Sequence, residues 1–96
     1  MTDFSEGFDP CSLIEDAKTQ APECTWLPDA LKNAGPGFWK SRAYVYYVSS
    51  KNANQPGAEW QHEKCIMLHS KTLGTIVIDV LTDNRLGGIE FVDKIE

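Results

Sequence analysis

The segment HEKCIMLH, residues 62–69, contains three side chains that can bind a metal ion: His62, Cys65 and His69. On an α-helix, spacings of three and seven residues would place all three on one face, which suits zinc. On a β-strand, His62 lies on one face while Cys65 and His69 lie on the other. Alternating polar and apolar residues favour the strand, and the sequence has no Cys-x-x-Cys pair to complete a ligand set. We therefore predict no metal ion and no other cofactor.

Two catalytic arrangements can also be considered from residue types. Cys65 or Cys24 could act as a nucleophile beside a histidine, but free cysteines among apolar residues are usually buried, and nothing predicts a lowered thiol pKa. Asp79 and Glu90 could form an acid–base pair for glycoside hydrolysis, although a 96-residue chain has little room for a sugar cleft. We expect no catalytic residues and no enzyme activity. A small Cys/His-dependent enzyme or a metal-binding domain remains the alternative.

The N-terminal third predicts two helices. Asp9 is a suitable N-cap and Pro10 suits a first helical position, which indicates a helix over residues 10–20 that ends before Pro22. A second, shorter helix begins near Pro28 and ends at the Gly35–Pro36 pair.

From Phe38 onward the hydrophobic period changes to two, which is typical of β-strands. Four strands are expected, over residues 38–50, 58–70, 75–81 and 86–92. The second of them should carry the following side chains on one face: Trp60, His62, Lys64, Ile66 and Leu68. Short connections predict an antiparallel meander on which the helices pack.

The predicted fold class is therefore α+β, with two N-terminal helices packed on a four-stranded antiparallel meander sheet. The length of 96 residues predicts a single domain over 1–96. Residues 1–8 form a loose lead-in, residues 9–36 a helical region and residues 37–96 the sheet.

Two glycines interrupt the last predicted strand. Gly87 and Gly88 follow a short turn, and glycine inside a strand usually marks a bulge or a close backbone approach. We expect a bulge that directs Ile89 and Phe91 into the core. Asp79 and Glu90 would then point away from the core, on a solvated face.

The net charge of −5 is placed unevenly along the chain. Residues 1–36 hold seven acidic residues against two basic ones, whereas residues 37–96 hold seven of each. Such a charge disfavours direct binding to nucleic acid and attracts a basic protein. Solubility alone is an equally good explanation of the acidic surface. No apolar run is long enough to cross a membrane and no signal peptide is recognisable, so a cytoplasmic protein is expected.

Aromatic residues are concentrated between Phe38 and Trp60. Many of them must fill the core of so small a domain. Because both faces of the first predicted strand carry aromatic side chains, one face could instead contact a partner, with Tyr44 and Tyr46 as anchors.

The acidic α+β format resembles the immunity proteins of bacterial contact-dependent inhibition and polymorphic toxin systems. The resemblance lies in the acid-rich helical segment EDAKTQAPECTWLPDA and in the sheet segments GFWKSRAYVYYV, GAEWQHEKCIML and GTIVIDVLTDNRLGGIEFVD. These proteins share no universal motif, so no residue role is transferred from the family.

The resemblance implies that an acidic surface docks over the basic active site of a cognate toxin, often a nuclease, with no direct contact to nucleic acid or membrane. A homodimerising regulatory module is a further alternative. The expected contact residues combine acids from both parts of the chain with aromatic anchors: Glu15, Asp16, Glu23, Trp26, Asp29, Tyr44, Tyr46, Asp79 and Glu90.

Overall fold

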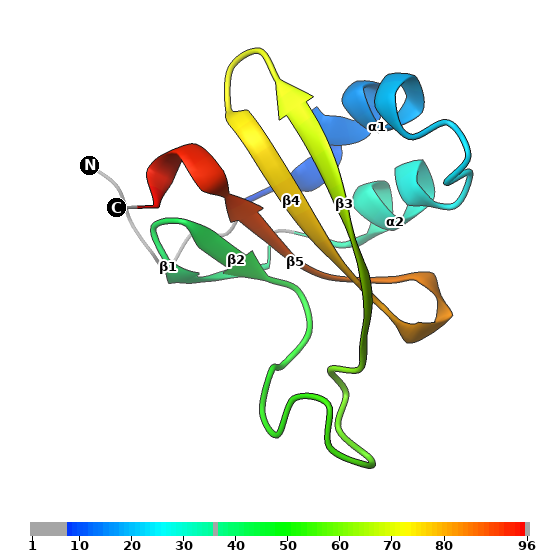
Figure 1. Ribbon diagram of the computed structural model, residues 1–96, viewed down its shortest axis with the longest axis vertical. Coiled ribbons are helices and arrows are strands. Elements are labelled where there is room, and N and C mark those ends of the chain that lie inside the picture. Colours follow the sequence, from blue (N-terminus) through cyan, green and yellow to red (C-terminus); the bar gives the residue numbers. More distant parts are fainter. Residues whose placement is uncertain (1–7, 36, 96) are drawn as a thin grey trace.

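The computed structural model describes residues 8–35 and 37–95 (Figure 1). Apart from Phe8, the predicted lead-in of residues 1–8 lies outside the described residues. Phe8 itself packs edge-on against Phe91, with 5.1 Å between the ring centroids. The chain therefore enters the folded part beside the last strand.

The helices form where the sequence predicts them. Asp9 accepts a hydrogen bond from the backbone N–H of Cys11 at 3.0 Å and caps the 3₁₀ turn η1, Pro10–Leu13. This turn runs directly into α1, Ile14–Gln20, and a second helix, α2, spans Leu27–Asn33. Leu13, Ala17, Leu27 and Leu31 are buried against the sheet and form the apolar stripe that packs the helices onto the core.

Within the described residues the sheet has five strands, all paired antiparallel: β1 (Phe38–Ser41), β2 (Tyr44–Tyr46), β3 (His62–Ser70), β4 (Gly74–Leu81) and β5 (Arg85–Phe91). Short 3₁₀ turns follow β4 and β5, namely η2 (Thr82–Asn84) and η3 (Val92–Lys94). The α+β class and the antiparallel pairing are confirmed, and the prediction of a four-stranded meander is wrong.

The error has two sources. The predicted strand over residues 38–50 is divided by a turn at Arg42–Ala43, which the alternating pattern hides because Ala43 is itself buried. The spatial order is β1-β2-β5-β4-β3, so the chain crosses from β2 to the far edge before it returns through β4 to β5. Such long-range pairing is not encoded in local periodicity, which reports faces and not neighbours.

One cluster of buried side chains joins both helices to the sheet, and Val45, Ile78 and Ile89 contribute to it from the central strands. The helices cover only this side of the sheet (Figure 1). The opposite side, called the open face below, carries the side chains that alternate with the core residues: Phe38, Tyr44, Tyr46, Cys65, Met67, His69, Thr75, Val77, Asp79 and Glu90.

The predicted bulge at the glycine pair is confirmed. Asp79 pairs with Gly88 while Val80 pairs with Leu86, which leaves Gly87 as the extra residue. Ile89 is fully buried as a result, and Asp79 points away from the core as expected.

None of the helices described here is long and apolar enough to serve as a membrane span.

Candidate functional site

Two rows of side chains cross the open face. Cross-strand pairing aligns Cys65 with Asp79, Asp79 with Gly88, and Gly88 with Tyr46. The next row contains Met67, Val77, Glu90 and Tyr44. Side chains directly opposite on adjacent strands contact one another, so the second row is a continuous surface across four strands, whereas Gly88 leaves bare backbone between Asp79 and Tyr46 in the first row.

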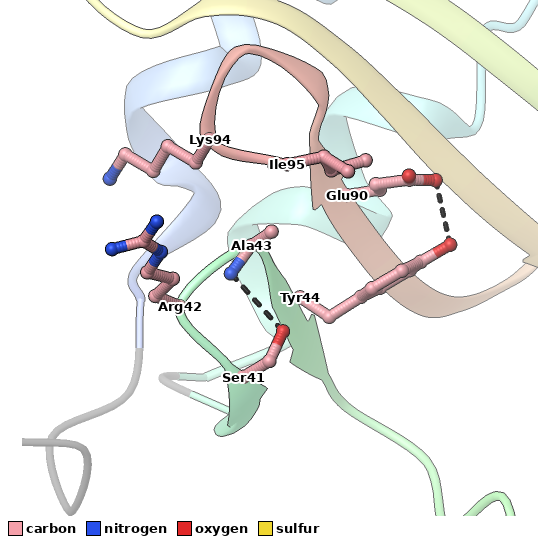
Figure 2. A pocket seen from close by; sticks show the side chains of 7 residues that line it. All are labelled: Ser41, Arg42, Ala43, Tyr44, Glu90, Lys94 and Ile95. Atoms are coloured by element: carbon pink, nitrogen blue, oxygen red, sulfur yellow. Dashed lines mark hydrogen bonds between the residues drawn. The ribbon is translucent and has the colours of Figure 1, made fainter.

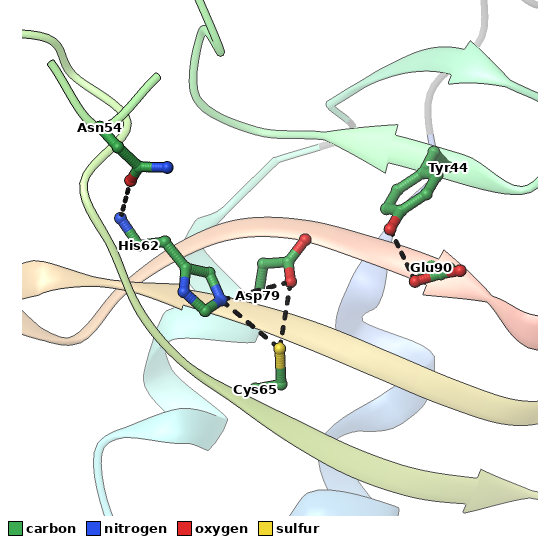
Figure 3. A network of polar contacts seen from close by, with 6 residues as sticks. All are labelled: Tyr44, Asn54, His62, Cys65, Asp79 and Glu90. Carbon is green, nitrogen blue, oxygen red and sulfur yellow. Dashed lines mark hydrogen bonds and ion pairs between the residues drawn. The ribbon is translucent and has the colours of Figure 1, made fainter.

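At one end of the first row, three potential metal ligands converge (Figure 3). The Sγ atom of Cys65 lies 3.4 Å from Nε2 of His62 and 3.5 Å from Oδ1 of Asp79. The same Nε2 atom lies 3.8 Å from that carboxylate oxygen. His62 and Cys65 are exposed, whereas the Asp79 side chain is only 16% exposed.

A bulge in β3 brings His62 to this position. His62 pairs with Leu81 and Lys64 with Val80, so Glu63 is an extra residue that reverses the alternation of faces. The prediction that His62 and Cys65 lie on opposite faces is therefore wrong. The predicted strand over residues 58–70 is confirmed only for residues 62–70, which form β3. Lys64 and the residues after it keep the predicted alternation, while those before Glu63 do not.

The loop before β3 holds this bulge in place. The side-chain oxygen of Asn54 accepts a hydrogen bond from the backbone N–H of His62 at 2.9 Å, and the backbone N–H of Asn54 donates to the carbonyl of Trp60 at 2.8 Å. Asn54 has a φ of 66°, a left-handed conformation that asparagine tolerates well. On the other side, Thr82 of η2 donates its N–H to the carbonyl of Gln61 at 2.8 Å.

The electrostatics of the cluster do not favour a thiolate nucleophile. Burial, followed by the hydrogen bond to Asp79, raises the pKa of the Cys65 thiol. Burial also raises the pKa of the Asp79 carboxyl, against the opposing effects of the Cys65 hydrogen bond and of His62. In a nucleophilic triad the acid contacts the ring nitrogen remote from the nucleophile. Here Cys65 and Asp79 both approach Nε2 of His62, so the three atoms surround a common point.

The second row ends in a tyrosine–carboxylate pair. The Tyr44 hydroxyl donates to Oε1 of Glu90 at 2.6 Å (Figure 3). Burial, and then the Glu90 hydrogen bond, raises the pKa of Tyr44, so the hydroxyl remains a donor. The bond holds the Glu90 carboxylate across the sheet surface.

An aromatic cluster adjoins both rows. The ring of Tyr46 lies 5.0 Å from that of Trp60, 5.7 Å from that of Tyr44 and 6.5 Å from that of Phe38, measured between centroids. Trp60 comes from the loop before β3 and is 7% exposed, whereas Phe38 is 47% exposed. The sequence pattern placed Trp60 on the face of Lys64, and the bulge at Glu63 explains why that prediction is wrong.

The glycine pair provides the space for this cluster. A Cβ atom on Gly88 would lie 3.0 Å from Cδ1 of Tyr46 and 3.3 Å from Cη2 of Trp60. A Cβ atom on Gly87 would lie 3.1 Å from the same atom of Trp60. The aromatic rings therefore rest on bare backbone, and this close approach is the second role of the two glycines.

A shallow depression of about 400 Å³ lies beside Tyr44 (Figure 2). Its walls include Glu90 and Ile95, together with the basic residues Arg42 and Lys94. Arg42 and Lys94 outnumber the single carboxylate of Glu90 in these walls, so the depression is not the acidic surface that the sequence predicts. The negative side chains of the open face extend instead from Glu90 toward Asp79.

The predicted contact residues fall into two groups on opposite sides of the sheet. Tyr44, Tyr46, Asp79 and Glu90 come together on the open face. The other group belongs to the helical layer: Glu15, Asp16, Glu23, Trp26 and Asp29.

Within the helical layer, Glu15 lies 3.8 Å from Lys18, with both side chains well exposed. Lys64 lies over the ring of Trp26 at 6.0 Å from its centroid. The fold therefore does not combine the two groups into one contact surface.

Sequence reasoning missed the role of Asp79 as the neighbour of Cys65. His69, which the sequence suggested as the third metal ligand beside His62 and Cys65, lies two rows away from Cys65 and pairs with Thr75. The pairing of β3 with β4 was predicted, but the register needed to align Cys65 with Asp79 was not. The bulge at Glu63 has no signal in the sequence, because the residue that holds it, Asn54, contacts His62 only in the folded chain.

Comparison with known proteins gives no relative: no family model, curated protein or solved structure matches this chain.

Proposed function

We propose that this chain is an immunity protein that binds the basic domain of a cognate toxin, such as a nuclease, and occludes its active site. The observation that supports the proposal is the open face, where aromatic rings and carboxylates lie together on a sheet surface that the described helices do not cover. An acidic aromatic surface of this kind suits a basic protein partner.

The apolar part of the open face has the composition of a contact centre. Met67 is 59% exposed and Phe38 is 47% exposed, although both are large apolar side chains. Tyr44 and Tyr46 lie between them and are partly exposed. Aromatic side chains and methionine are enriched where protein partners bury surface, and they account for much of the binding free energy.

The charged part of the same surface supplies specificity. Tyr44 holds the Glu90 carboxylate in place, and Asp79 lies on the neighbouring row. In a complex these carboxylates would pair with lysine or arginine side chains that otherwise bind the substrate phosphates of a nuclease. The acids of the helical layer, such as Glu15 and Asp29, are then assigned to long-range steering and not to contact.

The proposal predicts a toxin gene directly beside the gene for this chain, and a complex formed in the cytoplasm of the producing cell. The test is kinetic binding of the purified toxin domain, together with inhibition of its activity. Glu90→Lys and Glu15→Lys change the net charge equally but lie on opposite sides of the sheet, so they form a matched pair.

Glu90→Lys should weaken binding by at least ~30-fold, mainly through faster dissociation, which corresponds to about 2 kcal/mol for a desolvated charge pair. Glu15→Lys should change the association rate by less than about threefold, with the difference disappearing at high salt. Equal effects of the two variants, or a toxin that stays active when this chain is in excess, would overturn the proposal.

A further inference from the structure

The cluster of His62, Cys65 and Asp79 has the dimensions of a metal site. In tetrahedral zinc coordination, Zn–S bonds of about 2.3 Å and Zn–N or Zn–O bonds of about 2.0–2.1 Å place the ligand atoms roughly 3.3–3.6 Å apart. The three observed separations are 3.4, 3.5 and 3.8 Å. Only the His62–Asp79 separation would have to shorten, by a few tenths of an ångström.

The backbone around the cluster is already fixed. Cys65 and Asp79 are directly paired across β3 and β4, so their side chains leave the sheet side by side. His62 is held by the Glu63 bulge and by the hydrogen bond from its N–H to Asn54. Preorganised ligands lower the cost of ordering the site when an ion binds.

The donor set indicates which ion fits. A thiolate, an imidazole and a carboxylate suit Zn²⁺, whereas Mg²⁺ and Ca²⁺ require oxygen ligands. The two Sγ contacts, at 3.4 and 3.5 Å, are also within range of hydrogen bonds to sulfur, whereas the 3.8 Å between Nε2 of His62 and Oδ1 of Asp79 exceeds hydrogen-bond distance. A bound cation would attract both of these atoms and Sγ of Cys65 at once.

From this geometry we propose that His62, Cys65 and Asp79 bind one Zn²⁺ ion through Nε2, Sγ and Oδ1. The thiol of Cys65 releases its proton to solvent when the ion binds, and a water molecule fills the fourth position on the exposed side of the cluster. The site goes beyond the proposed toxin binding, and its test does not require the toxin. Asp79 belongs to both surfaces, so a bound ion would occupy its carboxylate and leave Glu90 and Tyr44, in the next row, for the partner.

The test titrates the metal-free protein with Zn²⁺ by calorimetry and with Co²⁺ by absorption spectroscopy. We expect one ion per chain and a sulfur-to-cobalt charge-transfer band in the near ultraviolet. Cys65→Ser should remove the band and lower Zn²⁺ affinity at least ~100-fold, because even the loss of an outer-sphere partner costs 10–100-fold. Asp79→Asn should weaken binding while the band remains.

Matched controls separate this site from adventitious binding. Cys11→Ser removes an exposed thiol elsewhere, and His69→Gln removes a histidine from the same face of β3. Both variants should bind Zn²⁺ as tightly as the natural chain does. Mg²⁺ should not bind. The proposal is wrong if no zinc binds at micromolar concentration, or if Cys65→Ser and Cys11→Ser have equal affinities. Circular dichroism of each variant establishes that it is folded.

Discussion

The substitution Gly88→Ala tests whether the aromatic cluster depends on bare backbone. Neither Gly87 nor Gly88 has a φ in the left-handed region, so alanine can adopt the backbone conformation and the effect must come from contacts. The new methyl group would lie 3.0 Å from Cδ1 of Tyr46, 3.1 Å from the carbonyl oxygen of Val45 and 3.3 Å from Cη2 of Trp60. Each is closer than an ordinary van der Waals contact, and the Val45 oxygen belongs to the paired backbone of β2 and cannot simply rotate away.

Two opposing effects determine the magnitude. Overpacking of a close contact costs about 1–3 kcal/mol. Replacing glycine by alanine lowers the conformational entropy of the unfolded chain, which raises the free energy of unfolding by about 0.4–1 kcal/mol. We therefore expect a net loss of about 1–2 kcal/mol in the free energy of unfolding. For a domain of this size, that loss lowers Tm by roughly 4–16 °C.

The assay is urea denaturation followed by tryptophan fluorescence, with thermal unfolding by circular dichroism. A double-mutant cycle with Tyr46→Ala tests whether the Tyr46 ring is the contact responsible. In the absence of that ring, Gly88→Ala should destabilise the protein by at least ~0.5 kcal/mol less than it does in the natural chain. A Gly88→Ala variant as stable as the natural chain, or strictly additive effects of the two substitutions, would refute the explanation.

Three further results are expected. Leu68→Ala should lower the free energy of unfolding by about 2–5 kcal/mol in urea denaturation, because Leu68 is completely buried in the core, whereas Met67→Ala beside it should change it by less than about 1 kcal/mol because Met67 is exposed. Burial raises the pKa of Tyr47 above its ordinary 10.0, so its contribution to stability is complete below about pH 10 and is lost as pH rises toward the folded-state pKa. Unfolding at several alkaline pH values should give a steeper loss for the natural chain than for Tyr47→Phe. Asn54→Ala should weaken zinc binding in calorimetry without removing the cobalt–sulfur band, because it releases the loop at His62 and leaves Cys65 in place.

Local patterns were sufficient for both helices and for one irregularity, but they missed the turn at Arg42–Ala43 that divides the first predicted strand. Asp9 and Pro10 define the start of the first helical segment through capping, which involves only neighbouring residues. The Gly87–Gly88 pair predicted a bulge correctly because the special conformational properties of glycine are themselves local. The expectation that Ile89 and Phe91 face the core is confirmed for the same reason.

The assembly of the candidate site required the tertiary structure. The sequence predicted a strand over residues 58–70, of which 62–70 form β3, and it predicted that Asp79 and Glu90 face away from the core. Only the folded chain decided that Glu63 is the extra residue, because the hydrogen bond from His62 to Asn54 joins a strand to a loop that has no periodic pattern. That bulge moves His62 to the face of Cys65 and Asp79. The β2–β5 pairing, a contact between segments more than forty residues apart, places Tyr44 against Glu90. Periodicity determines the face on which a side chain lies, whereas the neighbours on that face depend on register and strand order, which are set by the packing of the whole chain.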